Sequence, residues 1–358
     1  MRFVFRTRYE QDLRLFKDNG QKFCYGLLVA ALLLAPWLFP DYFVSQLVFI
    51  WIYSVVGLGL MLLVGYTGQI SMGHAAFLAM GAYTEAYLQS KGWPFVLSLA
   101  SAAVVSGLTG IVVGLPALRV KGMYLAIATL AFGFIVEEAV TRADGVTGGS
   151  SGMTLGSLEI FGLPIDSEQR FYYVSLAVLT LCILGVMNLM RSPTGRAFVA
   201  IRDSEISAQS MGINLGRYKT IAFALSAALA GVAGALYAHK LRFLSPEQFT
   251  FLQSIELLIM IVIGGLGSIH GAIFGAAFWI LAQQFIVIAK DWLPAAIGQQ
   301  TGLQPTVFGI FLVAFVLFEP LGLYGRWLKI RTYFEIFPFY RKGMFKRQKS
   351  YMKSERLK

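Results

Sequence analysis

The chain has few charged residues. Asp, Glu, Lys and Arg make up 14% of its 358 residues, whereas a soluble domain contains about 25%. Hydrophobic residues make up 57% of the chain, and the mean hydropathy is +0.66. This balance excludes an ordinary soluble globular domain and predicts a protein that lies mostly within a membrane.

Cysteine and histidine are also scarce. The two cysteines, Cys24 and Cys182, both fall in apolar runs, where we expect them to act as small apolar fillers. The three histidines, His74, His239 and His270, are scattered and have no metal-ligating partner one helical turn away. The sequence therefore predicts no disulfide framework, no metal site and no cofactor.

Motifs of ATP binding and of intramembrane catalysis are missing. No Gly-Lys dipeptide occurs, so the phosphate-binding pattern G-x-x-x-x-G-K-[ST] is absent. The metalloprotease pattern H-E-x-x-H is absent too, and no Ser/His/Asp arrangement is evident. We therefore expect a chain that is not an enzyme, and any ATP hydrolysis is expected in a separate subunit.

The sequence contains a series of apolar runs. Their lengths are close to the ~20 residues that a helix needs to cross a bilayer. They predict an all-α integral membrane protein with about ten transmembrane helices. The predicted spans are 23–40, 43–64, 70–90, 95–115, 122–140, 171–190, 220–239, 253–268, 271–289 and 305–324.

The basic residues predict the orientation of these spans. With both termini in the cytoplasm, 24 of the 30 Lys and Arg residues lie on the cytoplasmic side, as the positive-inside rule requires. They flank spans instead of forming a soluble basic domain, which argues against nucleic-acid binding. The predicted domains are a basic cytoplasmic arm 1–22, a transmembrane domain 23–325 and a basic cytoplasmic tail 326–358. The aromatic-rich tail suits either an anionic lipid surface or solvent.

A polar island at 191–219 interrupts the apolar pattern. Asp203 is expected to cap a helix that starts at Ser204, and Gly212 is expected to end it in the left-handed conformation. On the preceding side, Pro193 and Gly195 are expected to break the chain. An ordered polar helix between two spans predicts a docking element for a soluble partner; the alternative is an amphipathic helix that lies on the bilayer.

Charged and apolar side chains on this island are the expected contacts to the partner. Arg196, Arg202 and Glu205 offer charged anchors, and Ile206 and Met211 offer apolar ones.

Charged residues within the spans are few. Glu85 and Glu256 lie deepest, and they either line a polar pathway or pack locally. An ion-coupled carrier that uses Glu85 or Glu256 is an alternative function, in which an uncoupler would abolish uptake even when ATP is maintained.

Two glycine segments occupy similar places in the two halves of the chain. Such interrupted apolar segments predict either broken helices beside a transport pathway or close helix packing through small residues. The candidate pathway residues in and beside these segments are Gly65, Gly68, Ser71, Gly73, His74, Gly264, Gly265 and Gly267. Thr147, Gly148 and Gly149 belong to the longest outer connection, which either lines an outer gate or meets a soluble partner, or is a flexible loop.

Several of these motifs together resemble a known family. Residues 195–212, followed by Arg217-Tyr218-Lys219, resemble the cytoplasmic coupling loop of binding-protein-dependent ABC importer permeases, and more narrowly the LivM type of branched-chain amino acid permease. Segments 65–77, 230–238, 245–249 and 264–268 extend the similarity, which covers roughly residues 45–325. The spacing from Glu205 to Gly212 is one residue longer than in the broader importer loop, as is usual for this subfamily.

The resemblance implies a multi-pass protein of the bacterial inner membrane. Its implied partners are a second permease of the LivH type, two cytoplasmic ATPases, a periplasmic binding protein and membrane lipid. The implied substrates are leucine, isoleucine and valine; urea, other amino acids and small organic acids are alternatives within the same class of importer. The residues implied to couple the chain to the ATPases are Gly195, Arg196, Arg202, Asp203, Glu205 and Gly212.

Overall fold

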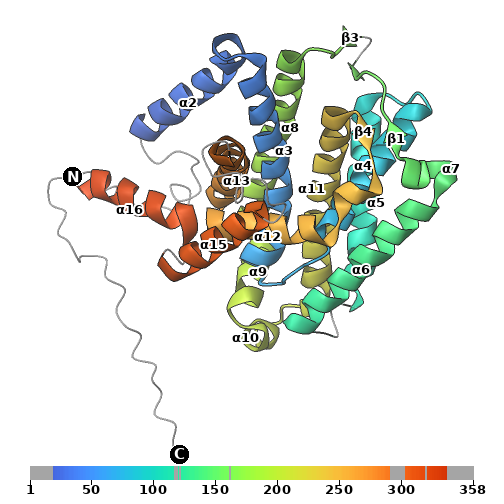
Figure 1. Ribbon diagram of the computed structural model, residues 1–358. Helices are drawn as coiled ribbons and strands as arrows, with labels where there is room; N and C mark the ends of the chain where they lie inside the picture. The colour runs from blue at the N-terminus through green and yellow to red at the C-terminus, as the bar shows by residue number, and fades with distance from the viewer. Residues whose placement is uncertain are drawn as a thin grey trace, which may run out of the picture.

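Helices make up most of the computed structural model, which describes residues 19–116, 120, 122–160, 163–290, 303–318 and 321–336 (Figure 1). Two antiparallel pairs of two-residue strands are the extended elements within these ranges. The longer helices are α2 (Asn19–Leu38), α3 (Asp41–Leu60), α4 (His74–Ser90), α5 (Phe95–Gly114), α6 (Met123–Arg142), α8 (Glu168–Arg191), α9 (Pro193–Asp203), α11 (Leu215–Leu241), α12 (Phe251–Gly264), α13 (Ile269–Lys290), α15 (Leu303–Phe318) and α16 (Gly322–Ile336).

The all-helical membrane fold predicted from the sequence is confirmed. Each predicted span overlaps one of these helices, and six helices in the described ranges are long and apolar enough to cross a membrane. These six are α3 with the π-helix that continues it (Met61–Tyr66), α5, α6, α8, α11 and α13. The apolar part of α2, Lys22–Leu38, and helix α12 are shorter, and α4 and α15 have 17 and 16 residues. Residues 1–18 of the predicted arm 1–22 and residues 337–358 of the predicted tail 326–358 lie outside the described residues. The rest of the arm lies in α2, and the tail begins within α16.

Helices α4, α5 and α11 form one tightly packed group. Glycines allow the backbones of α4 and α11 to come close together, since a Cβ atom added to Gly81 would lie 2.2 Å from the carbonyl oxygen of Gly231. Similarly, a Cβ atom on Gly234 would lie 2.1 Å from the carbonyl oxygen of Leu78. Small residues are enriched at membrane helix contacts because they let two backbones pack closely.

This packing predicts that Gly234→Ala destabilises the protein. The added methyl group must push α4 and α11 apart, which we expect to cost about 1–3 kcal/mol. Gly185→Ala on α8 is the matched control, because no atom lies within 4 Å of the position of its Cβ atom. Thermal unfolding of the purified protein in detergent should show a lower Tm for Gly234→Ala alone; equal Tm values in both variants would refute the prediction.

Helices α3, α8 and α13 form a second group beside the first. The rings of Trp51 on α3 and Tyr172 on α8 meet edge to face, with centroids 6.0 Å apart. The Tyr172 hydroxyl donates a hydrogen bond of 2.9 Å to the carbonyl oxygen of Leu32, which ties α8 to α2. On α13, the methyl group of Ala272 lies against Gly57 of α3.

Some helix faces remain exposed and apolar. On α5, Val104, Leu108 and Val112 follow one another at four-residue spacing, and each is more than half exposed. Ile127 and Phe134 continue such a surface on α6. Exposed apolar stripes of this kind are expected where helices face lipid or another membrane subunit.

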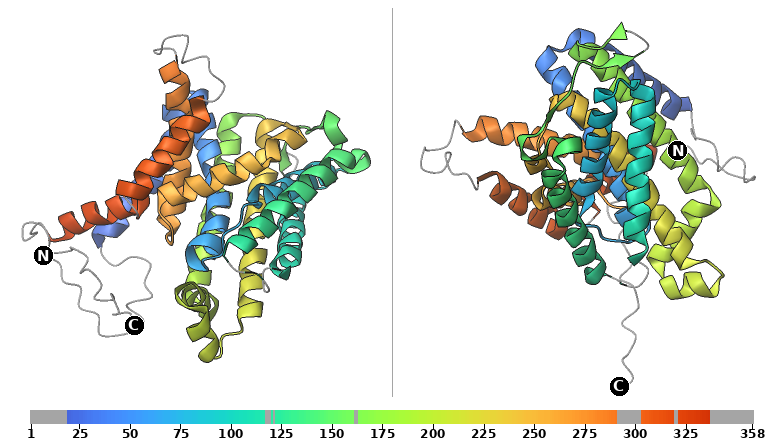
Figure 2. Two further views of the ribbon diagram at one scale, coloured as in Figure 1. Left: turned by 60° about the horizontal axis from the view of Figure 1, so that its bottom comes forward. Right: turned by 90° about the vertical axis from the view of Figure 1, so that its right-hand side faces the viewer.

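The two ends of the bundle are built differently. Helix α9 and the short helix α10 (Glu205–Ser210) project at the lower end in Figure 1. The short helix α7 (Asp144–Thr147) and the strands lie at the opposite end, and both views in Figure 2 show the same separation. Strand β1 (Met153–Thr154) pairs with β4 (Phe243–Leu244), and β2 (Glu159–Ile160) pairs with β3 (Leu163–Pro164).

Candidate functional site

The polar island forms two helices instead of the one predicted. The expected break occurs beside Pro193, because α8 ends at Arg191, Ser192 is extended, and Pro193 begins α9, where its missing N–H group costs nothing. Gly195 does not break the chain. Gly195 lies inside α9 and packs against the end of α8, where a Cβ atom would be 2.4 Å from the Cα atom of Met190. Phe198 and Ile201 bury one face of α9 in the bundle. The first helix of the island is therefore fixed to the membrane helices.

Helix α10 has a different cap from the one predicted. Ser204, not Asp203, precedes the helix, and the Ser204 hydroxyl accepts a hydrogen bond of 3.2 Å from the backbone N–H of Ser207. The cap lies one residue later because the Asp203 carboxylate already accepts two bonds from Arg202. Gly212, with a φ of +84°, follows the helix in the left-handed region, as predicted.

An ion pair fastens α10 to the next membrane helix. The Nζ atom of Lys219 lies 2.6 Å from the Oε1 atom of Glu205, and the Lys219 side chain is only 5% exposed. A charge this deeply buried is stabilised chiefly by its partner. Glu205 therefore bonds within the chain. Its expected role as an anchor for a partner stays a prediction.

The outward-facing side chains of the island are mainly apolar. Ile206 on α10 is 81% exposed, and Met211 at its end is 84% exposed. Arg196 is also exposed, and its guanidinium donates a 3.4 Å bond to the carbonyl oxygen of Arg191. A rigid helix that shows two large apolar side chains to solvent has the character of a docking surface.

The glycine segments lie at helix connections beside α9. Gly65 falls in the π-helix that ends the α3 span, and Gly264 is the last residue of α12. The two segments meet, since a Cβ atom on Gly65 would lie 2.8 Å from the backbone nitrogen of Gly267. Gly68, Gly265 and Gly267 all have positive φ values of 71°, 111° and 82°. These positions form turns that other residues adopt only with strain.

Several candidate pathway residues instead fit the second interpretation of the glycine segments, which is close helix packing. A Cβ atom on Gly73 would lie 2.0 Å from the carbonyl oxygen of Thr129, and one on Gly264 would lie 2.0 Å from that of Gly271. His74 is fully buried at the start of α4, with its Nε2 atom 3.3 Å from the Ser226 hydroxyl.

Ser71, in the turn just before α4, is buried as well. Its hydroxyl has no hydrogen-bond partner among the described residues. Neither Ser71 nor His74 is open to a passing solute in this conformation.

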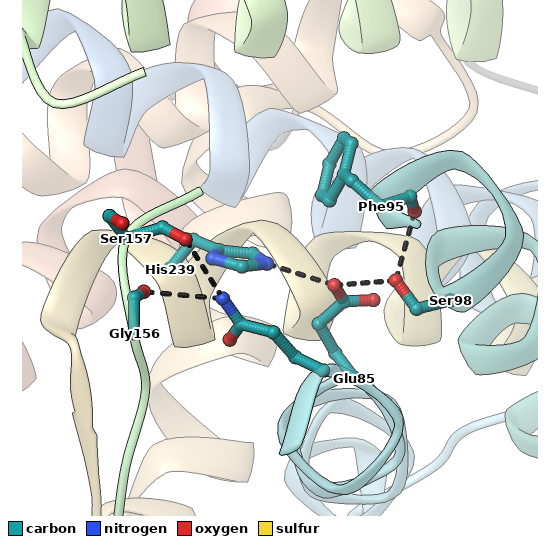
Figure 3. A network of polar contacts seen from close by, with 7 residues as sticks. Glu85, Phe95, Ser98, Gly156, Ser157 and His239 are labelled. Atoms are coloured by element: carbon teal, nitrogen blue, oxygen red, sulfur yellow. Dashed lines mark hydrogen bonds and ion pairs between the residues drawn. The ribbon is translucent and has the colours of Figure 1, made fainter. Parts of the chain in front are cut away.

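Glu85 belongs to a buried network that the sequence analysis did not find. Its Oε1 atom lies 2.8 Å from the Nε2 atom of His239 and accepts a 2.7 Å bond from the Ser98 hydroxyl. Figure 3 shows these three side chains converging from α4, α11 and α5. All three are buried, and the ring of Phe95 covers His239 edge-on with centroids 5.3 Å apart. No local pattern signals the pair, because 154 residues separate its members.

The outer end of this network borders a small cavity. It has a volume of about 30 Å³ and is lined in part by His239, Asp166, Glu168, Lys240 and Arg242. This space holds no more than a few water molecules. It is too small for an amino acid, so we do not identify it as a substrate pocket.

Glu256 has a more open position than Glu85. It is half-buried on α12, within electrostatic range of Tyr53 and Tyr237. The rings of Tyr53 and Tyr237 are 6.4 Å apart, and Phe249 adds a third ring 6.1 Å from Tyr237. A carboxylate beside aromatic rings is a suitable environment for an ammonium group.

The outer connection is ordered by its own hydrogen bonds. The Thr147 hydroxyl donates to the carbonyl oxygen of Val140 at 2.6 Å and accepts from the backbone N–H of Gly149 at 3.2 Å. Gly148 and Gly149 have φ values of 73° and 56°, which other residues adopt only with strain. The alternative of a loosely turned loop is therefore less well supported than a built surface. Within the described ranges, no three His, Cys, Asp or Glu side chains come together as metal ligands would.

Comparison with known proteins identifies the family. Residues 42–318 match the family described as branched-chain amino acid transport system, permease component. The chain is 36% identical to the LivM high-affinity branched-chain amino acid permease proteins of Salmonella typhimurium and Escherichia coli, over 76% of this chain and 67% of each relative. It is 24% identical to LivH of Escherichia coli, over 76% of this chain and 91% of that one. No solved structure matches the chain.

These findings agree with the helical architecture. Apolar helices of spanning length and permease relatives together make the chain a multi-pass protein of the inner membrane. The resemblance predicted from the motifs is confirmed: the chain belongs to the permease component family of the branched-chain amino acid transport system.

Proposed function

We propose that this chain is a translocating subunit of an ABC importer that moves branched-chain amino acids inward, driven by ATP hydrolysis in separate subunits. The observation that supports this most directly is the α9–α10 loop of a permease-family chain. Its α10 presents two exposed apolar side chains on a helix that Lys219 fastens to the bundle. Leucine, isoleucine and valine are the proposed substrates because the LivM relatives are named for branched-chain amino acid transport.

The proposed complex contains four further subunits. A LivH-type permease packs beside this chain, in keeping with relatives of both the LivM and the LivH type. Two ATPases bind on the cytoplasmic side, one of them against α10. A periplasmic binding protein delivers substrate to the outer connection that contains Thr147, Gly148 and Gly149. Exposed apolar faces such as that of α5 meet the second permease or lipid.

Coupling in this proposal is a shift of population between two permease conformations. Docked ATPases must contact the two conformations differently, because a ligand that binds both equally shifts nothing. Rigid attachment of α10 to α11 through Glu205 and Lys219 lets a displacement of the loop reach the membrane helices. Arg196 and the apolar pair Ile206 and Met211 are the proposed contacts to the ATPase.

The proposed pathway passes Glu256 instead of Glu85. Glu256 is half-buried beside aromatic rings, where its carboxylate suits the ammonium group of an amino acid. Glu85 is bonded to His239 and Ser98 inside a closed network, which suits a structural role. The ion-coupled alternative loses support because one of its two acids is enclosed in this way.

The docking surface predicts that Ile206→Glu separates the permease from the ATPase. A charge in the centre of an apolar contact is expected to cost about 2 kcal/mol or more, which is about a 30-fold loss of affinity. The measurement is gentle purification of the tagged chain from its native cell, followed by quantification of co-purifying ATPase and second permease.

Val146→Glu is the matched control for this experiment. Val146 is an exposed apolar residue of α7, at the end of the molecule opposite to α10, and the substitution adds the same charge. We expect this variant to retain the ATPases. A wild-type chain that purifies alone, and transports without ATP after reconstitution, would refute the proposed function.

A further inference from the structure

Arg202, the next-to-last residue of α9, lies where both glycine segments meet. Its Nη1 atom donates a hydrogen bond of 3.1 Å to the carbonyl oxygen of Gly65. A Cβ atom built on Gly267 would lie 3.2 Å from the same nitrogen. One guanidinium nitrogen therefore touches the connection after α3 and the connection after α12, segments that are 202 residues apart in the sequence.

The rest of the Arg202 side chain is held as well. Its Cγ atom lies against Gly68, 3.3 Å from the position of a Cβ atom there. Its Nε and Nη2 atoms donate to the Oδ1 atom of Asp203 at 3.2 and 3.1 Å. A planar guanidinium makes several directed bonds at once, which the single ammonium group of lysine does not reproduce. The contacts thus specify arginine and not merely a positive charge.

The two glycine segments are packed against each other beneath this arginine. A Cβ atom on Gly65 would lie 2.8 Å from the backbone nitrogen of Gly267, so the two backbones touch. The N–H group of Gly267 in turn points at the Sδ atom of Met61, 3.0 Å away. Arg202 covers a junction between the ends of two membrane helices, and α9 brings it there.

We propose that Arg202 is the positioning residue through which movement of α9 reaches both glycine segments. This inference rests on the proposed function, because α9 moves only if the ATPases pull the loop. The hydrogen bond from Arg202 to Gly65, together with the contact of the same guanidinium with Gly267, which packs against Gly65, makes the two connections follow α9 together. Coupling needs contacts that differ between the two conformations, and a charge-assisted bond to a backbone carbonyl at a glycine turn is such a contact.

This role differs from docking. The guanidinium of Arg202 bonds inward to the bundle and sideways to Asp203, whereas Ile206 and Met211 face outward. Changing Arg202 should therefore leave the ATPases bound and able to hydrolyse ATP. What it should break is the link between hydrolysis and transport.

The test is Arg202→Lys in the complete complex, reconstituted into liposomes with its binding protein. We expect the ATPases to co-purify in the wild-type ratio and to hydrolyse ATP, while leucine taken up per ATP hydrolysed falls by about tenfold, the value of one charge-assisted hydrogen bond. Arg191→Lys is the matched control, since Arg191 at the end of α8 makes none of these side-chain contacts. It should transport like the wild type.

Three results would contradict these statements in distinguishable ways. Unchanged uptake per ATP in Arg202→Lys would overturn the inference. Loss of the ATPases from that variant would overturn it too, because Arg202 would then be a docking residue. Absence of the ATPases from the wild-type complex would overturn the proposed function itself.

A second variant covers the case in which Arg202→Lys lowers the yield of folded complex. Asp203→Ala keeps the arginine but removes the carboxylate that orients it. We expect a smaller loss of uptake per ATP, with hydrolysis retained. Full coupling in Asp203→Ala would then overturn the inference.

Discussion

Replacing Glu205 with lysine is expected to release α10 from the bundle and to weaken ATPase binding by about tenfold or more. The substitution removes the carboxylate whose Oε1 atom lies 2.6 Å from the Nζ atom of Lys219 and brings a second cation near that almost wholly buried ammonium group. Leaving a buried charge unpaired costs about 3–5 kcal/mol; Glu205 is itself 27% exposed, so we expect about 2 kcal/mol here.

Two measurements follow the effect. Co-purification with the ATPases should fall by about tenfold or more, in proportion to the lost free energy. Limited trypsin digestion should cut faster at Arg217, next to the loosened helix, because proteolysis follows local opening. Wild-type values for both would show that the ion pair contributes nothing to the loop.

A charge swap separates an internal tie from a contact to the partner. In Glu205→Lys combined with Lys219→Glu the pair is restored with its charges reversed, so ATPase binding should largely return. If Glu205 instead contacts a basic residue of the ATPase, the swapped chain will bind no better than the single variant. Rescue thus supports the geometry of α10 and α11 seen here.

Local chemistry explains which parts of the loop the sequence predicted. The helix end at Gly212 was correct because a left-handed residue after a helix has a strong local preference for glycine. The cap was displaced from Asp203 to Ser204 because both residues are good caps and Arg202 occupies the carboxylate. The choice between Asp203 and Ser204 depends on where the side chain of Arg202 points, and only the fold determines that direction.

The membrane helices were predictable for a similar reason. Spanning length and apolarity are properties of one continuous segment, so α5, α6 and α11 could be located from the sequence. The end of α3 was less exact, since its last turn is a π-helix that runs into the Gly65 connection. Contacts such as that of Arg202 with Gly65 join residues 137 positions apart and leave no periodic signal in a single sequence.

Removing one partner from the buried network between α4, α5 and α11 is expected to destabilise the protein strongly. His239→Leu leaves the carboxylate of Glu85, which is fully buried, with the Ser98 hydroxyl as its remaining partner. We expect this variant to lose about 3–5 kcal/mol of stability. Glu85→Gln should cost less, because it removes the charge and keeps groups that can hydrogen-bond to Ser98 and His239.

A double-mutant cycle tests whether the two residues act as a pair. Glu85→Leu combined with His239→Leu removes both polar partners, so its Tm should lie above that of His239→Leu alone. Additive changes in Tm would mean that the two side chains stabilise the protein independently. Uptake measured on the same variants separates structure from transport: if Glu85→Gln keeps a wild-type Tm but abolishes uptake, Glu85 serves an ion-coupled pathway. Retained uptake with a lowered Tm would identify the network as a fixed tie between helices, around which the coupling loop and the glycine segments move.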